Sequence, residues 1–408
     1  NGDIVLDSNN GVINIKDGGT EFLRISESSG DSVIQSTVQD KKIFFSGDDN
    51  GGGVNALILD MADAGAATFN AGITSTGLIT ATAGSQNLRL GENAGDSIAN
   101  GGNFNVFAGY NAGTANTIGD ENVAIGHAAL AANVAGSKST AIGQGALNAQ
   151  NKASDAAGDQ LNTAVGYHAG VLVNTGVQNT LIGALSGDTL STGKNNVAVG
   201  YQALETEDTG DRSVAIGSFA LKTQNNDSDN YNAALGYAAG LYVSTAVGST
   251  FVGGLAGQGI STVLLTGNNN TAVGRDAGLL LQGTASENTL VGAFAGDAIT
   301  TGAENVCVGL GAGGGINTGT RNTCLGDDAG NAITTATRSI AIGHVAMGST
   351  AVTGTGNIAI GNLSGSKMLA GAQNLMIGES AGAELTSGGS NVFLGQGAGA
   401  NVTTGGAN

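Results

Sequence analysis

Histidine, cysteine and clustered carboxylates are the side chains that would carry chemistry in this chain of 408 residues. The histidines are His127, His168 and His344, and no two of them are spaced as a credible ligand pair. None has carboxylates at the spacing of a metal site or of a catalytic triad. We therefore interpret all three as exposed turn residues. We predict no catalytic residues, no metal ligands and no cofactor, so the expected protein is not an enzyme.

Acidic residues outnumber basic ones by 32 to 14, which gives a net charge of −18. Glycine-rich acidic rolls can bind calcium, but the GGxGxDxUx nonapeptide of that class is absent, and Asp and Glu do not recur at a fixed spacing. Only the isolated loops SGDDN (46–50) and NNDSDN (225–230) indicate calcium, and they do so weakly. The acidic balance also argues against nucleic acid as a partner, because phosphate binding needs clustered Lys and Arg.

Glycine content limits the fold. The chain has 72 glycines and no proline, with 40% hydrophobic and 11% charged residues. Each glycine inside a helix costs about 0.5–1 kcal/mol, so long helices are not expected. Collagen is excluded because there is no three-residue period, and disorder is a poor interpretation of so apolar a chain. No apolar run approaches the roughly 20 residues that span a bilayer, so we predict no membrane insertion.

A repeat of about 17 residues organises most of the sequence, as in NTAVGYHAG (162–170) and NVAVGYQAL (196–204). We number each repeat from the glycine that follows an aliphatic pair, which is position 0. Eighteen such glycines give seventeen intervals, eleven of them of 17 residues. A constant period of this length predicts a solenoid with one coil per repeat. With about 4.8 Å between neighbouring strands, the rod would be about 85 Å long.

Each position in the repeat has a physical interpretation. Position −4 is Asn in fourteen copies and Ser in four, which suits a corner and allows an amide ladder between coils. Positions −3 to −1, such as Thr163-Ala164-Val165, predict a short strand with apolar residues on both faces. One face can be the inside of the coil, and the other needs a partner such as a second chain. A turn signal, as at Thr175-Gly176, predicts a second, shorter strand in each coil. Glycine at +4 predicts a bend where a larger side chain would strike the next coil.

Cys307 and Cys324 lie 17 residues apart, so they should stack on adjacent coils. They are either two small buried thiols or a pair, within one chain or between chains. A bridge between neighbouring parallel strands has awkward geometry, which favours buried thiols.

Position +1 is the freest in the repeat and contains Tyr110, Tyr167, Tyr201 and Tyr237 among many other residue types. A partly aromatic row on a rigid rod can meet a saccharide receptor, and these four tyrosines are our receptor-contact candidates. The alternative is a solvated turn that tolerates tyrosine.

Residues 1–86 lack the period but contain short apolar runs such as DIVLD, VINIK, SVIQS, KIFFSG and ALILDM. They predict a β-rich amino-terminal module or collar, followed by a β-roll over 87–408.

Two blocks of the sequence resemble known protein families. NGDIVLDSNNGVINIKDGG, together with residues 40–77, resembles the repeat-bearing region of tail fibre and structural proteins of marine bacteriophages. The NTAVGYHAG copies are similar to coils of such fibres and to the head repeats of trimeric autotransporter adhesins. The sequence matches neither the self-cleaving chaperone domain that ends many such fibres nor the coiled coil and membrane barrel of an autotransporter.

The resemblance implies a homotrimeric, elongated appendage directed at a receptor. We expect a non-enzymatic structural fibre or shaft of a phage virion, located on the virion outside the cell. Its partners would be its own sister copies, other tail or baseplate proteins, and a host-surface receptor such as a polysaccharide. The alternative is a bacterial surface adhesin of the autotransporter type. An ice-binding solenoid would need flat rows of Thr, and a polysaccharide-degrading tailspike would need clustered carboxylates; the repeat shows neither.

Overall fold

Twenty-six β-strands and no helix are found in the part of the chain that the computed structural model describes. That part comprises residues 12–28, 31–38, 42–49, 52–60, 66–69, 86–98, 101–151 and 158–406. The chain divides into two compact units, Asn1–Leu78 and Ile79–Asn408. The all-β class predicted from the glycine content and the short apolar runs is confirmed.

The amino-terminal unit contains two three-stranded antiparallel sheets. The first sheet contains β1 (Val12–Asp17), β2 (Thr20–Ser28) and β3 (Asp31–Ser36). The second sheet contains β4 (Lys42–Asp49), β5 (Gly52–Asp60) and β6 (Ala66–Phe69). The turn between β1 and β2 is made by Gly18 and Gly19, both at positive φ. The strands predicted at VINIK, SVIQS, KIFFSG and ALILDM are confirmed, whereas DIVLD lies outside the described residues.

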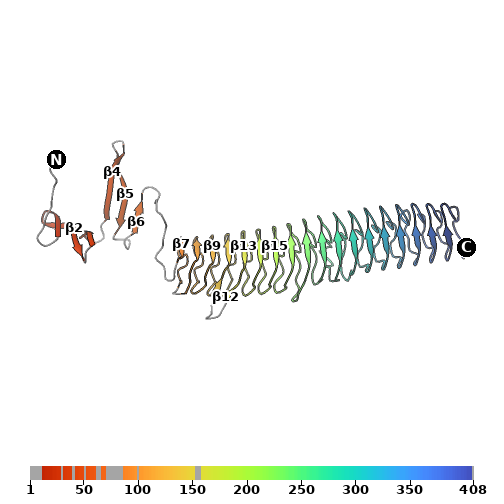
Figure 1. Cartoon of the computed structure of the whole chain (residues 1–408), viewed down its shortest axis with the longest axis horizontal. Helices are drawn as coiled ribbons and strands as arrows, with labels where there is room; N and C mark the ends of the chain where they lie inside the picture. Colours follow the sequence, from red (N-terminus) through yellow and green to blue (C-terminus); the bar gives the residue numbers. More distant parts are fainter. Residues whose placement is uncertain are drawn as a thin grey trace. The chain divides into compact units, whose positions relative to one another are not determined.

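One three-residue strand per coil forms the parallel sheet of the second unit (Figure 1). Each strand ends at the residue before one of the eighteen glycines. The strands are β7 (Leu88–Leu90), β8 (Val106–Ala108), β9 (Val123–Ile125), β11 (Thr140–Ile142), β13 (Thr163–Val165), β14 (Thr180–Ile182), β15 (Val197–Val199), β16 (Val214–Ile216), β17 (Ala233–Leu235), β18 (Thr250–Val252), β19 (Thr271–Val273), β20 (Thr289–Val291), β21 (Val306–Val308), β22 (Thr323–Leu325), β23 (Ile340–Ile342), β24 (Ile358–Ile360), β25 (Leu375–Ile377) and β26 (Val392–Leu394).

The pairing between these strands is parallel and keeps every repeat position in register, as in Ala164 opposite Leu181. It runs in one unbranched series from β7 to β26. The predicted parallel β-solenoid with one coil per 17-residue repeat is therefore confirmed.

The second strand that we expected in each coil is mostly wrong. In the described part of the return leg, only β10 (Gly136–Ser137) and β12 (Gly158–Asp159) form a ladder, with a few isolated bridges elsewhere. The return leg still bonds from coil to coil, for example from the amide of Asn174 to the carbonyl of Ser191 at 2.8 Å. It does not form a strand because these bonds lack the pattern of a parallel ladder: the amides of Asn174 and Gly176 both bond to the carbonyl of Ser191, at 2.8 and 3.2 Å.

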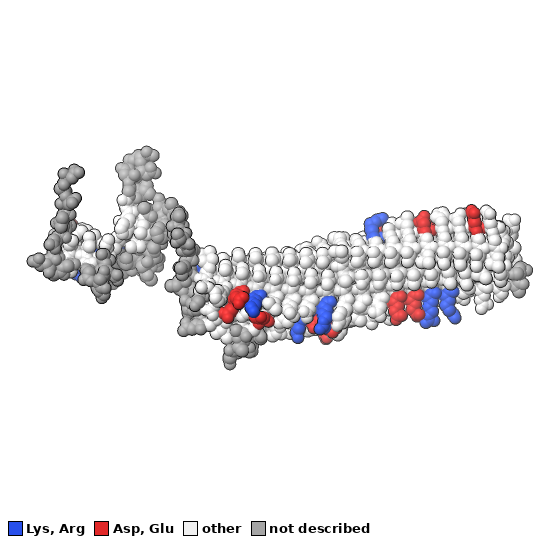
Figure 2. Space-filling view, viewed as in Figure 1, with Lys and Arg blue, Asp and Glu red and all other residues white. Residues whose placement is uncertain are grey.

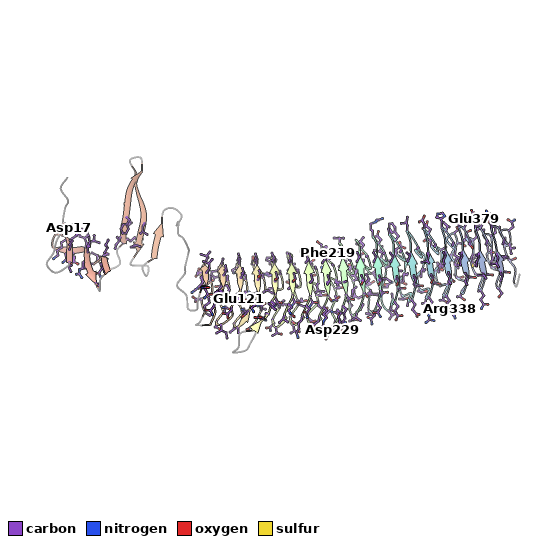
Figure 3. All side chains as sticks on the ribbon, in the orientation of Figure 1. Asp17, Glu121, Phe219, Asp229, Arg338 and Glu379 are labelled. Carbon is purple, nitrogen blue, oxygen red and sulfur yellow. The ribbon has the colours of Figure 1, made fainter. Side chains whose placement is uncertain are left out.

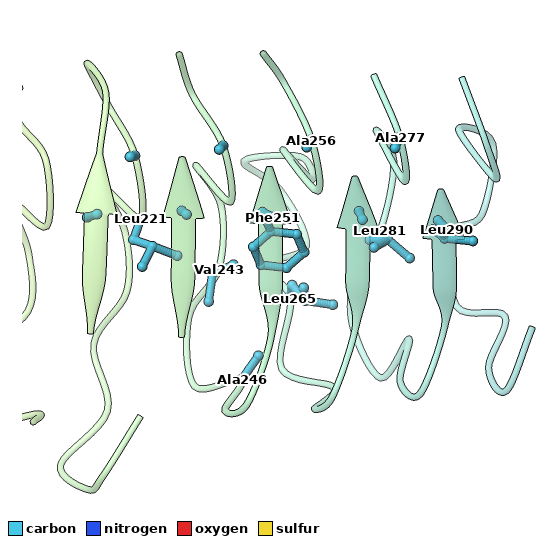
Figure 4. Close-up of a cluster of buried hydrophobic side chains, with 14 of the residues drawn as sticks. Leu221, Val243, Ala246, Phe251, Ala256, Leu265, Ala277, Leu281 and Leu290 are labelled. Atoms are coloured by element: carbon cyan, nitrogen blue, oxygen red, sulfur yellow. The ribbon is translucent and has the colours of Figure 1, made fainter. Parts of the chain in front are cut away.

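The core lies between the strand and the return leg (Figure 4). The middle residue of each strand points inward and is fully buried from β8 to β25, whereas its two neighbours point outward. Inward positions exchange volume within a coil. Each of the five coils with Leu or Met at +4 has Ala at −2, as in Ala141 with Leu147, whereas Phe at −2 occurs only with Gly at +4, as in Phe251 with Gly257.

The predicted clash of a larger side chain at +4 with a neighbouring coil is confirmed in part. A Cβ added at Gly170 would lie 2.5 Å from Leu181 of the next coil, whereas a Cβ added at Gly113 would lie 2.6 Å from the ring of Phe107 in its own coil. Contact with the next coil's backbone restricts position 0. A Cβ added at Gly109, where φ is +136°, would lie 2.6 Å from the carbonyl oxygen of Gly126. Glycine is therefore required at position 0 because neighbouring coils approach there through backbone alone.

The predicted asparagine ladder is present and buried. The amide group of Asn305 donates to Oδ1 of Asn288 at 3.1 Å and to the carbonyl of Gly319 at 2.9 Å. Its own Oδ1 accepts from the backbone and side-chain amides of Asn322 at 3.0 and 3.1 Å. Each Asn thus joins two coils and closes its own corner, which satisfies polar groups that the solenoid buries.

Candidate interaction surfaces

The outward side of the long sheet is a surface without a charged residue. Its two rows, positions −3 and −1 of all eighteen coils, contain only Val, Ile, Leu, Ala and Thr. We call these two rows the aliphatic face. In the single chain they are half-buried or exposed, and the exposed fraction reaches 50% at Leu235 and 63% at Leu394. Monomeric proteins rarely expose so long and continuous an apolar surface, which makes the face a candidate interaction surface.

Threonines do stack within this face, contrary to our expectation. Parallel pairing aligns Thr140, Thr163 and Thr180, and again three consecutive threonines beginning at Thr250. Each run spans only three coils, and the adjacent row at −1 carries Val and Ile there. These arrays are therefore one residue wide, too narrow for the flat surface that ice binding would need.

Two edges border the aliphatic face, one at each end of the strands. We call position −5 the entry edge and position +1 the exit edge. Figure 3 shows Glu121 and Arg338, both at −5, on the lower side of the sheet, and Glu379, at +1, on the upper side. Charged side chains gather along two lines in the same view (Figure 2), and the surface between them carries none. The apolar face is thus framed by polar edges, as protein interfaces commonly are.

The entry edge contains an ion pair between adjacent coils. Arg321 holds Glu304 through two nitrogen–oxygen contacts of 2.9 Å, and its guanidinium lowers the pKa of the Glu304 carboxyl. Both side chains are exposed, so solvent screening keeps the contribution to stability small.

The exit edge carries all four tyrosines predicted as receptor contacts. They are half-exposed, between 45% for Tyr201 and 58% for Tyr237. Tyr201 and Tyr237 both contact the ring of Phe219 in T-shaped geometry, at centroid distances of 5.4 and 5.9 Å. Phe219 was missed because it lies at +2, where the sequence shows no pattern; only folding places that position beside +1 of the neighbouring coils.

The other two tyrosines contact histidines instead. Tyr110 stacks on His127 at 5.5 Å, and Tyr167 stacks on His168 at 4.0 Å. His127 is exposed as expected, but His168 is half-buried beneath its tyrosine, so the expectation was wrong for that residue. His344 is exposed and lies 3.2 Å from the amide oxygen of Asn362. The predicted tyrosine row is therefore divided into separate aromatic groups.

Cys307 and Cys324 are both free and fully buried on the paired strands β21 and β22. Their hydrogen bond, together with burial, raises the pKa of the Cys307 thiol well above its usual range. The interpretation as buried thiols is confirmed.

A buried carboxylate lies inside the solenoid at position +7. Glu207 is fully buried and accepts from the amide of Gly210 at 2.8 Å and from the side chains of Gln224 and Asn230 at 2.9 Å. Burial raises the pKa of this carboxyl, and the hydrogen bonds partly offset the rise. Gln224 also donates to Ser213 at 2.8 Å, so it fills the space that the shorter Ser leaves in the asparagine ladder. All these groups bind one another, which indicates a structural network.

Among the described residues, no group of three or more His, Cys, Asp or Glu side chains could hold a metal ion. This search covered residues 225–230, whereas the side chains of residues 47–50 in the other candidate calcium loop lie outside the described part of the chain. A helix long and apolar enough to cross a membrane is likewise absent from the described ranges.

Comparison with known proteins gives no assignment, because no family model, no curated protein and no solved structure matches the chain.

Proposed function

We propose that the chain is a non-enzymatic structural protein that assembles as a homotrimeric rod through its aliphatic face. The uncharged aliphatic face is the single observation that carries this proposal. The resemblance to marine phage fibres supplies the number of copies and the setting, a fibre or shaft of a virion that supports attachment to a host surface. Tail or baseplate proteins and a host-surface receptor are the partners that this role requires.

The size of the aliphatic face supports a stable assembly. Eighteen strands at about 4.8 Å spacing, each about 10 Å wide, give a face of about 850 Å². A typical stable interface buries about 800 Å² on each partner. The face is therefore large enough for specific association, and its apolar composition resembles an obligate interface.

A rod built in this way has a mechanical function. Neighbouring coils are bonded through the strand and the return leg, and through the asparagine ladder where Asn occupies position −4. Stiffness follows from this continuous bonding, and the sister copies would cover the one apolar side that remains. Such a rod can hold a receptor-binding end away from the particle without any reaction.

Charge introduced into the aliphatic face tests this proposal. Ile182 points outward and is 38% exposed, so Ile182→Lys should fold as a single chain but lose the trimer. Thr192→Lys, on the exposed return leg of the same coil, is the matched control. Sedimentation or native mass measurement should give a trimer for the wild type and the control, and smaller species or aggregates for Ile182→Lys. A monomeric wild type would disprove the assembly, and electron micrographs of the source particle with this chain labelled would test the virion location.

A further inference from the structure

The two edges of the aliphatic face carry matching residue types on the same coil. Three large apolar residues occupy position −5 among the coils of the described solenoid, and each shares its coil with a tyrosine at +1. The pairs are Phe104 with Tyr110, Leu161 with Tyr167, and Tyr231 with Tyr237. All six are exposed in the single chain, by 44% to 59%.

Some of the other coils show a similar correspondence, whereas others, such as Arg338 with His344, do not. Glu121 shares its coil with His127, and Arg321 shares its coil with Asp327. Gly248 shares its coil with Gly254, so both edges lack a side chain at the same level. Glu304 shares its coil with Leu310 and does not match it, and Glu304 and Arg321 already bind each other within one chain.

Matched positions of one chain cannot meet. They are six residues apart and lie at opposite ends of one strand. At about 3.3 Å per residue, their Cα atoms are separated by up to about 20 Å. The entry and exit edges also lie on opposite sides of the sheet (Figure 3). Tyr231 is instead held by Arg212, 5.6 Å above its ring, and by Asp229 at 3.1 Å, while Tyr237 contacts Phe219. A match between groups that do not touch within a chain points to contact between chains.

We propose that sister copies lie parallel and in exact axial register, with the entry edge of each copy packed against the exit edge of the next. This inference rests on the proposed homotrimer and adds its orientation and register. Rotation about an axis parallel to the rod brings position −5 of one copy to position +1 of its neighbour on the same coil, and the contact closes into a ring. Phe104, Leu161 and Tyr231 would then each pack on a tyrosine of the neighbour.

The alternative, antiparallel arrangement fits the residues poorly. It would place Phe104, on the second coil, against the seventeenth coil, whose edge residues are Gln373 and Glu379. Parallel register also changes the interpretation of the exit edge. Tyr110, Tyr167 and Tyr237 become contacts between copies, and only Tyr201, which shares its coil with Asn195, remains free for a receptor.

Dityrosine coupling tests the register in the intact protein. A photoexcited ruthenium complex with persulfate oxidises exposed phenols, and two tyrosines in contact then join through a carbon–carbon bond. We expect covalent multimers of the wild type up to the trimer on a denaturing gel. Tyr231→Phe and Tyr237→Phe should each reduce them at least tenfold, because both phenols of the bond are needed. Tyr201→Phe is the matched control and should leave the multimers unchanged.

The outcomes separate this inference from the proposed function. A native trimer that forms no covalent multimers, or whose multimers survive Tyr231→Phe, would overturn the register and leave the trimer intact. A monomeric native mass would overturn both. Covalent dimers as the largest product, dependent on both tyrosines, would support the parallel register and replace three copies by two. Each variant keeps its aromatic ring, so loss of folding is not expected to obscure the result.

Discussion

At the scale of single residues, backbone geometry restricts the residue type at a repeat position more than side-chain chemistry does. Position 0 combines a φ near +130° with direct approach of the next coil's backbone, so two independent constraints demand glycine. The corner asparagine at −4 is restricted as strongly, because its amide completes four hydrogen bonds in the case of Asn305. Position +1 meets neither constraint, which explains why it is the freest in the repeat.

Neighbouring glycines allow a direct test of this restriction. At Gly253, φ is +133° and an added Cβ would lie 2.5 Å from the carbonyl oxygen of Gly274, whereas Gly254 has open space. We expect Gly253→Ala to lower the free energy of unfolding by about 2 kcal/mol or more, through strain and overpacking. Gly254→Ala should change it by less than about 0.5 kcal/mol. Denaturant unfolding of both variants checks this, and equal effects would contradict our account of position 0.

Residue-scale predictions from the sequence succeeded where one position determines the contact. The asparagine ladder and the buried cysteines follow from the 17-residue spacing alone, since equal positions stack on adjacent coils. Phe219 and the stacking of Tyr167 on His168 could not be derived, because positions +1 and +2 have no fixed residue type. Their contacts depend on side-chain rotamers at a corner of the coil.

At the scale of the element, the volume of the core is shared between positions and, in part, between neighbouring coils. Leu at +4 with Ala at −2 fills the same space as a large residue at −2 with Gly at +4. Where a coil has Ala at −2 and Gly at +4, as with Ala164 and Gly170, a large residue of the next coil, Leu181, lies against the glycine. The second strand failed as a prediction for a related reason. The aliphatic residue near Thr175-Gly176 marks a side chain that enters the core, Val173, and it gives no information about backbone hydrogen bonding. The bonds between coils do not follow the pattern of a ladder in this segment, and residue types do not show this.

A double substitution within one coil tests volume exchange. Leu147→Gly should lower the free energy of unfolding by about 2–3 kcal/mol. The cavity left by the leucine side chain costs more than is gained by removing the strain of a left-handed leucine at φ +47°. Adding Ala141→Leu should restore at least about 1 kcal/mol of the free energy of unfolding. The two residues that pair with position 141 on the adjacent strands are Ala124 and Ala164, and both are small enough to leave room for the new side chain. Ala141→Leu alone should destabilise by overpacking. Thermal unfolding of the three variants measures the coupling, and strictly additive effects would show that the two positions fill separate spaces.

At the scale of the whole molecule, the solenoid is a sum of coils, each bonded mainly to its nearest neighbours. This stacking explains both why insertions are tolerated and where ion pairs form. Extra residues, as at 148–160, leave the parallel register of β11 and β13 unchanged. The ion pair of Glu304 and Arg321 exists because equal positions on adjacent coils lie side by side. The number of coils should therefore be adjustable in whole units, and only in whole units.

Deleting residues 288–304 removes one complete coil of 17 residues, from one corner asparagine to the residue before the next. Asn305 would then stack on Asn270, and Arg321 would meet Glu287 in place of Glu304, so the ladder and the ion pair are both rebuilt. We expect a folded rod about 4.8 Å shorter, with a melting temperature within a few degrees of the wild type. Deleting only residues 288–295 places a return leg where a strand must pair, and should abolish cooperative unfolding. If both deletions were tolerated equally, or neither were, the 17-residue repeat would not be the unit of folding. Because every sister copy of the proposed trimer would lose the same coil, we expect the shortened rod to assemble as the full-length chain does.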